Sequence, residues 1–180
     1  MPSQTFPALS QLEFLAYISA TGELAEGFES KIGVYAVFDA DKALQYVGYS
    51  RNVALSLKQH LVRHPGRCGW LKVELCDRPN RTLLEETRAA WLAEAGPLPS
   101  GDTPEEDTWT QPIDIRYALT DAEQQSFPAM DELGQRKLLK QVARRVEASI
   151  LADLESRGVT IPLRFDPKLK DDGKLNLKAE

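Results

Sequence analysis

The sequence of 180 residues has no long hydrophobic run and only two cysteines. No stretch approaches the roughly 20 apolar residues of a membrane-spanning helix. The first residues, MPSQTFPALSQ, lack a basic region followed by an apolar run, so no secretory signal is expected. Two cysteines, Cys68 and Cys76, are too few for a disulfide framework and favour a reducing compartment. These absences predict a soluble, cytoplasmic protein without a membrane partner.

The chain also lacks a net positive charge. Its 22 Lys and Arg and 27 Asp and Glu give a net charge of −5, which argues against a constitutive nucleic-acid binder. The charge is uneven, because residues 41–83 contain eight Lys and Arg against three Asp and Glu, a balance of +5 that leaves −10 elsewhere. The basic module in this stretch, residues 42–81, is either a phosphate-binding surface for DNA or a face that docks the acidic remainder of the chain.

Two short segments, IGVYAVFD and LQYVGYS, are joined by the turn DADK. Their β-branched and aromatic residues predict an antiparallel hairpin. Each strand carries a tyrosine, Tyr35 in GVY and Tyr46 in YVG. Residue type alone leaves two interpretations: packed aromatic rings with solvent-facing hydroxyls, or the working hydroxyls of an active site.

Further elements follow the hairpin. Asn52 is a good N-cap for the amphipathic helix VALSLKQHLVRH, WLKVELC suits a third strand, and Asn80 is the expected N-cap of a second helix, RTLLEETRAAWLAEA. Near the C-terminus, a long helix from about Gln135 to Arg157 is expected to bury one face, formed by Leu139, Val142, Val146, Ile150 and Leu154. The predicted class is α/β, with a small, mainly antiparallel sheet of about three strands, flanking helices and a C-terminal helical extension.

Four regions are expected along the chain. Residues 1–30 form an N-terminal element whose apolar run LEFLAYI is too short to decide between helix and strand. Residues 31–96 form the α/β domain. Residues 97–133 are acidic and Pro-rich and predict a linker, and residues 134–180 predict the C-terminal helix and a polar tail.

The order strand-strand-helix-strand-helix, with GVY and YVG on the first two strands, resembles the GIY-YIG nuclease superfamily over residues 32–96. Within it, the sequence is most similar to cyanobacterial single-domain members and to the domain that precedes the glutaredoxin part of plastid monothiol glutaredoxins. The shared stretches are KIGVYAVFD, LQYVGYSRN, CGWLKV and RPNRTLLEE. No CGFS glutaredoxin motif occurs in the sequence.

The resemblance implies a metal-dependent endonuclease that hydrolyses DNA phosphodiesters with Mg²⁺ or Mn²⁺. It implies that Tyr35 serves proton transfer to the attacking water and that Tyr46 orients that water. Glu85 or Glu86 would bind the metal. The residues expected around the phosphate are Arg51, Lys58, His60, Gly48 and Asn52.

Two positions depart from the family pattern. The family's helical Arg falls on Ser56, and its metal-binding Glu falls on Arg88. A Ser cannot replace a guanidinium fork, and an Arg repels a metal cation. A second hypothesis is therefore a catalytically inactive module that keeps the pocket and binds nucleic acid or a protein partner.

The cysteines raise two further possibilities. Cys68 follows Arg67 and lies near Arg63 in sequence, a setting that can lower a thiol pKa, so Cys68 is a redox candidate; the alternative is a small buried hydrophobe. His60 and His64 have the i, i+4 spacing of helical metal ligands. The cysteine spacing matches no standard zinc finger, however, and solvated histidines with buried thiols are the simpler interpretation.

Overall fold

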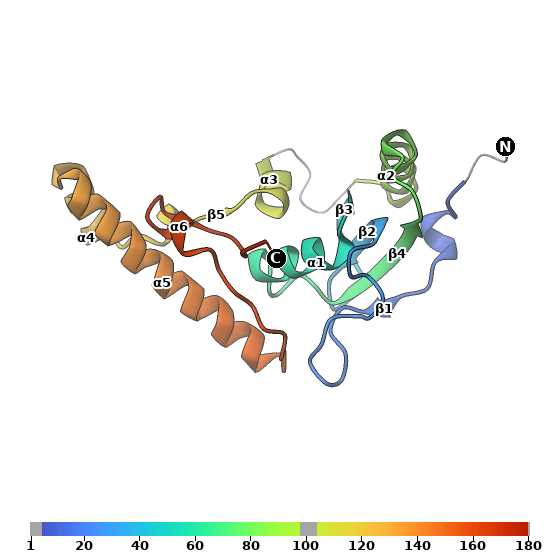
Figure 1. The fold of residues 1–180 in the computed structure, drawn as a ribbon, viewed down its shortest axis with the longest axis horizontal. Helices are drawn as coiled ribbons and strands as arrows, with labels where there is room; N and C mark the ends of the chain where they lie inside the picture. Colours follow the sequence, from blue (N-terminus) through green and yellow to red (C-terminus); the bar gives the residue numbers. More distant parts are fainter. Residues whose placement is uncertain (1–4, 98–103, 180) are drawn as a thin grey trace.

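A computed structural model describes residues 5–97 and 104–179. Its main feature is a four-stranded antiparallel sheet with the strand order β1-β4-β2-β3 (Figure 1). The strands are β1 (Leu15–Ala16), β2 (Ile32–Phe38), β3 (Leu44–Ser50) and β4 (Trp70–Cys76). This confirms the predicted α/β class with an antiparallel sheet. The apolar run of the N-terminal element supplies the short edge strand β1, which pairs with β4.

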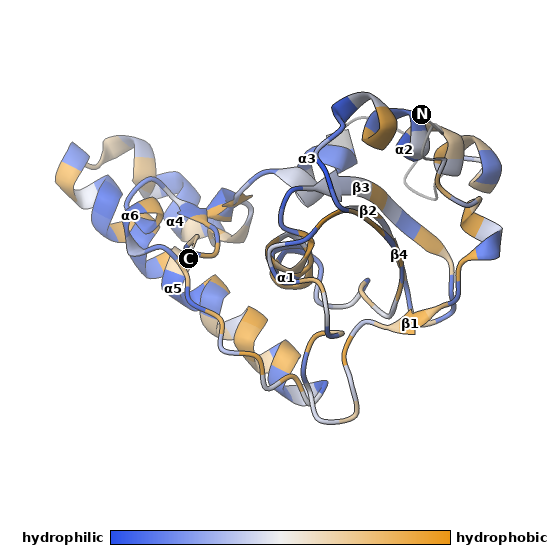
Figure 2. Cartoon of the chain, turned by 45° about the vertical axis from the view of Figure 1, so that its right-hand side comes forward, coloured by the Kyte–Doolittle hydropathy of each residue, from blue (hydrophilic) through white to orange (hydrophobic). Residues whose placement is uncertain are grey.

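The sheet is covered on both faces, because side chains alternate across β2. Tyr35 and Val37 belong to the same buried cluster as helix α1 (Val53–Arg63), whereas Val34 and Ala36 belong to the cluster of helix α2 (Arg81–Ala95). Figure 2 shows α1 nearly end-on beside the curved strands.

Both expected helix caps are present. The Leu55 amide donates to Asn52 Oδ1 over 3.2 Å at the start of α1, and the Leu83 amide donates to Asn80 Oδ1 over 3.1 Å near the start of α2. These bonds fix where both helices begin and therefore which of their side chains face the sheet.

The long C-terminal helix α5 (Glu132–Ser156) starts three residues before the expected position, where Asp131 caps it. The helix extends away from the sheet, and the C-terminal segment runs between it and α1 (Figure 1). Its buried residues include all five of the expected face, namely Leu139, Val142, Val146, Ile150 and Leu154. They pack in one continuous core with Phe165, Leu175 and Leu177 of the C-terminal segment. The predicted polar tail therefore contributes core residues.

The part of the expected linker that the structure describes, residues 104–133, contains regular elements. This part contains α3 (Pro104–Thr110), β5 (Ile113–Asp114), η2 (Ile115–Ala118), α4 (Asp121–Ser126) and η3 (Phe127–Ala129). Strand β5 pairs with β6 (Lys174–Leu175), which follows the short helix α6 (Pro167–Lys170). The remaining elements are η1 (Leu9–Gln11) and the connecting loops. Across residues 5–97 and 104–179, no helix has the length and apolar character to cross a bilayer.

Candidate active site

The two hairpin tyrosines meet a histidine from α1. Tyr35 Oη lies 2.7 Å from His60 Nε2, and the rings of Tyr46 and His60 are 4.9 Å apart between centroids. All three side chains are buried, with exposed fractions of 2% for Tyr35, 8% for Tyr46 and 3% for His60. The hairpin register places Gly48 opposite Tyr35. A Cβ there would lie 2.6 Å from Tyr46 Cε1 and 3.0 Å from Tyr35 Oη, so glycine makes room for both rings.

Burial sets the protonation of this group. Desolvation raises the pKa of Tyr35 far above its usual value, so the phenol stays protonated. Desolvation, with repulsion from Arg63, lowers the pKa of His60 to about 3, so its imidazole is neutral near pH 7. The protonated phenol can therefore donate a hydrogen bond to the neutral imidazole, whereas the raised pKa of Tyr35 and the lowered pKa of His60 both oppose transfer of the proton from Oη to Nε2. His60 Nδ1 has no hydrogen-bond partner among the described residues.

Helix α3 covers the rings of Tyr46 and His64 through its residue Trp109. The Trp109 indole is 1% exposed and lies nearly parallel to the Tyr46 ring, with 5.4 Å between centroids and 7° between planes. The same indole stacks on His64 at 4.0 Å and 29°, and the His64 Nε2 atom lies 2.9 Å from Thr108 Oγ1. One turn of α3 therefore covers the rings that the sequence predicts as a site.

Three arginines surround this aromatic group, and α3 supplies a partner to each. Arg63 donates to the backbone carbonyl of Trp109 and, over 3.0 Å, to Asn176 Oδ1. Arg67 forms an ion pair with Glu105. Arg88 donates to the Val47 carbonyl over 2.8 Å. The same Arg88 side chain pairs with Glu106 over 2.7 Å. We call Arg63, Arg67 and Arg88 the arginine cluster.

The two expected metal ligands lie in different places. Glu85 lines a pocket of about 510 Å³ together with Tyr46, Gly48, Tyr49, Arg88 and Glu106. Glu86 lines a separate pocket beside the N-terminal segment, with residues such as Phe6 and Ala8. The structure thus brings Glu85, but not Glu86, to the tyrosines.

This arrangement does not fit a divalent metal ion. Glu85 accepts from Tyr49 Oη over 3.0 Å and pairs with Arg81 over 2.7 Å, and Glu106 is held by Arg88. Both carboxylates of the pocket are therefore already paired with an arginine, and the positive charge of Arg88 in the same pocket opposes a cation. Within the described ranges, no group of three or more His, Cys, Asp or Glu side chains is placed to hold a metal, including the His and Cys set.

The other expected phosphate ligands lie apart from the tyrosines. Asn52 and Lys58 line a second groove of about 350 Å³ that is also lined by Arg164 and Lys178 of the C-terminal segment. Arg51 is exposed just before α1. At the position of the family's arginine, Ser56 donates to Ser50 Oγ over 2.8 Å and cannot reach a phosphate as a guanidinium does.

The Cys68 environment differs from the expected one. The side chain is 1% exposed, and its Sγ lies 3.6 Å from the His60 carbonyl oxygen. Burial raises the pKa of the thiol to about 12, although Tyr17 and the nearby Arg157 and Arg67 act in the opposite direction. The expected lowering of this pKa is therefore wrong, because desolvation outweighs the neighbouring cations. Cys68 and Cys76 are both unpaired thiols.

Sequence reasoning missed the residues that complete the site. In the sequence, Arg63 and Arg67 belong to the basic module and lie near Cys68, and neither is expected at the tyrosines. Trp109 and its acidic neighbours Glu105 and Glu106 lie in the expected linker. The available signal was the stretch PEEDTW, in which carboxylates precede a large aromatic residue, together with the expectation that acidic segments could dock on the basic module.

Comparison with known proteins agrees in part with the sequence resemblance. No protein-family model matches the chain. Over 91 residues the chain is 35% identical to the bifunctional monothiol glutaredoxin-S16, chloroplastic, of Arabidopsis thaliana. The match covers 48% of this chain and 31% of that protein, so the chain spans about a third of its relative's length. This supports similarity to plastid monothiol glutaredoxins. Membership of the GIY-YIG superfamily stays a prediction, and so does a cytoplasmic location, since the relative is chloroplastic.

Proposed function

We propose that this protein is a nucleic-acid-binding module whose arginine cluster, beside the buried tyrosines, contacts the phosphodiester backbone. The observation that carries the proposal is the convergence of Arg63, Arg67 and Arg88 on one aromatic pocket. Guanidinium groups bind phosphate oxygens through paired hydrogen bonds. Backbone contacts of this kind supply affinity without base sequence specificity.

The chain's own chemistry at the cluster supports an anionic ligand. Each arginine is bound by a carbonyl or carboxylate oxygen of α3, which is the type of group that a phosphate would replace. The acidic net charge of −5 favours binding at faces where cations gather, such as the arginine cluster. The other class of ligand that could bind the arginine cluster is a protein whose surface carries carboxylates as α3 does.

A second candidate function is hydrolysis of DNA phosphodiesters, favoured by the contact of 2.7 Å between Tyr35 Oη and His60 Nε2. At this distance the neutral imidazole of His60 accepts a hydrogen bond from the Tyr35 phenol and so orients the hydroxyl, whose oxygen can accept a hydrogen bond from an attacking water. The carboxylates of the pocket do not fit Mg²⁺ or Mn²⁺ while Arg81 and Arg88 hold them. We therefore derive no step through a metal and place binding first.

Two measurements on the full chain test these functions. Fluorescence anisotropy with a labelled oligonucleotide at increasing salt measures binding, with Arg88→Gln as the test variant. Arg144→Gln is the matched control, because Arg144 is exposed on α5, away from the sheet. We expect salt-dependent binding that Arg88→Gln weakens and Arg144→Gln does not. Equal affinity in both variants, or no binding by any of them, contradicts the binding function.

The second measurement is nicking of supercoiled plasmid in Mg²⁺ or Mn²⁺, with an EDTA control and a Tyr35→Phe variant. Nicking that disappears in EDTA and in Tyr35→Phe supports hydrolysis through the phenol. Nicking that persists in Tyr35→Phe contradicts this role of Tyr35. Absence of nicking together with salt-dependent binding leaves the binding module as the function.

A further inference from the structure

We infer that α3 is an internal substitute for single-stranded nucleic acid, with Glu105 and Glu106 in the places of two phosphates and Trp109 in the place of a base. A single strand then binds by displacing α3 from the arginine cluster. The inference rests on the proposed function, because it names the ligand class and the regulation of that same site.

The charged contacts carry the first part of this inference. Glu105 and Glu106 are adjacent in sequence, yet their carboxylates bind Arg67 and Arg88, which come from different elements. Arg67 precedes β4, and Arg88 lies on α2. The two adjacent carboxylates each reach a separate guanidinium group. Neighbouring phosphates on one strand would present two negative charges to these arginines in the same way.

The aromatic contacts carry the second part. The indole of Trp109 lies between two partners that stack on nucleobases in single-strand-binding proteins, a tyrosine and a histidine. The Arg67 guanidinium carbon lies 5.2 Å from the centre of the same indole, so Arg67 meets both the carboxylate and the ring. A base inserted in this position would find a stacking surface on Tyr46 and a cation nearby.

The geometry favours a single strand over a duplex. Trp109 presents the face of its ring to Tyr46, with planes 7° apart. In a duplex the base faces are covered by the neighbouring base pairs, and only unstacked bases can offer a free face. A flexible strand can place one base against Tyr46 while its flanking phosphates reach Arg67 and Arg88.

The cover that α3 provides is incomplete. Three buried side-chain nitrogens at this interface, His60 Nδ1, Arg63 Nε and Trp109 Nε1, have no hydrogen-bond partner within the described part of the chain. Unpaired buried donors weaken a contact. A helix of seven residues is also too short to be stable without its packing. After α3 is displaced, a ligand with several oxygen acceptors can pair with the two of these groups that stay in the site, His60 Nδ1 and Arg63 Nε, while Trp109 Nε1 reaches water.

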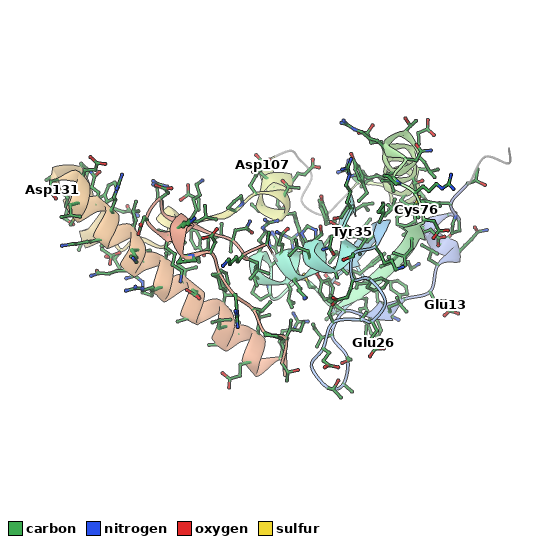
Figure 3. The ribbon with its side chains drawn as sticks, in the orientation of Figure 1. Glu13, Glu26, Tyr35, Cys76, Asp107 and Asp131 are labelled. Carbon is green, nitrogen blue, oxygen red and sulfur yellow. The ribbon has the colours of Figure 1, made fainter. Side chains whose placement is uncertain are left out.

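The test compares variants that change the α3 charges. The double variant Glu105→Gln/Glu106→Gln keeps the shape of both side chains and removes both ion pairs. The matched single comparison is Glu106→Gln against Asp107→Asn, since Asp107 is exposed on the same helix (Figure 3) and forms no ion pair among the described residues. The probe is a labelled oligothymidylate of roughly 12 nucleotides, with the corresponding duplex as competitor.

We expect the double variant to bind oligothymidylate about three- to tenfold more tightly than the unmodified chain. Glu106→Gln should bind more tightly than Asp107→Asn, and the duplex should compete weakly. Binding that is equal in the double variant, Glu106→Gln and Asp107→Asn overturns the inference while leaving the proposed function in place. Absence of salt-dependent binding in every variant overturns both.

Tryptophan emission gives an independent readout that does not depend on affinity. Trp109 is buried while α3 packs on the arginine cluster, so its displacement by oligothymidylate should shift the emission to longer wavelength. The shift should be absent in Trp109→Phe, which retains a ring and avoids the cavity of an alanine variant. Binding without any shift in the unmodified chain means that α3 stays in place and contradicts the inference.

Discussion

The Trp109 indole lies nearly parallel to the Tyr46 ring, with 5.4 Å between the ring centroids. Trp109 comes from the predicted linker, whereas Tyr46 belongs to the hairpin. Through this contact α3 completes a site that the hairpin and α1 begin. The same helix turn brings Glu105 and Glu106 to Arg67 and Arg88. The site is therefore a closed arrangement of aromatic rings and ion pairs, and its ligand must compete with a part of the chain itself.

The first prediction concerns how the free energy of unfolding depends on pH. The pKa of His60 is about 3 and that of His64 about 4, both lowered chiefly by desolvation, with Arg63 acting on His60 and Arg67 on His64. Glu105 acts on His64 in the opposite direction. Lowered histidine pKa values mean that the unfolded chain binds more protons, so stability is complete above the unfolded pKa of about 6.5 and falls as pH drops below it.

We expect the free energy of unfolding to fall by roughly 2 kcal/mol between about pH 7.5 and about pH 5, chiefly from the fully buried His60. Urea unfolding followed by circular dichroism measures this fall. His60→Gln should reduce the fall. A free energy of unfolding that is flat over this range contradicts the buried, neutral state of His60.

The second prediction concerns the C-terminal segment. Phe165 is 7% exposed and packs in the core with Leu177 and α5. Phe165→Ala should cost about 3–5 kcal/mol of unfolding free energy, because it leaves a cavity. Lys168→Ala, at an exposed position on α6, is the control and should change stability by less than about 0.5 kcal/mol. Similar stability of the two variants would mean that the segment is not part of the core.

The α/β core could be predicted because its signals are local. Asn52 and Asn80 cap the expected helices, and the α5 face from Leu139 to Leu154 is buried as its spacing predicts. These features depend on neighbouring residues in one element. The tyrosine pair was also predicted, because Tyr35 and Tyr46 lie on adjoining strands of one hairpin.

The cover of the site could not be predicted in this way. Helix α3 has seven residues, too few for a periodic pattern, and its acidic and proline residues resemble a loop. Its structure depends on the contacts of Trp109 with residues some 45 to 63 positions earlier, which no local pattern encodes. The Cys68 pKa is raised rather than lowered for the same reason, because the depth at which the thiol is buried depends on the tertiary fold.

The third prediction concerns thiol reactivity. With a pKa of about 12 and almost no exposure, the Cys68 thiol should react slowly with iodoacetamide in the folded protein and rapidly after unfolding in urea. Mass spectrometry of the labelled peptides measures both rates. Fast labelling of Cys68 at neutral pH in the folded chain would contradict this environment and would support the redox role, which otherwise stays a prediction.

The fourth prediction concerns the second groove, where Lys58 lies near Arg164 and Lys178. In the described part of the chain, none of the three forms an ion pair within 4.0 Å. If a bound strand extends to this groove, Lys58→Ala should reduce the slope of log affinity against log salt by about 0.7. Lys137→Ala, exposed on α5, is the control. An unchanged slope in Lys58→Ala limits the nucleic-acid contact to the arginine cluster.

In the proposed complex, a nucleobase takes the position of Trp109 against Tyr46. Photocrosslinking of a single-stranded oligonucleotide that contains 5-bromodeoxyuridine, followed by tryptic digestion and mass spectrometry, tests it most directly. We predict that the main crosslinked peptide is residues 43–51, ALQYVGYSR, with the link at Tyr46, and that the Glu105→Gln/Glu106→Gln variant increases its yield. Crosslinks confined to peptides outside the pocket, with none at residues 43–51, would contradict this position of the base.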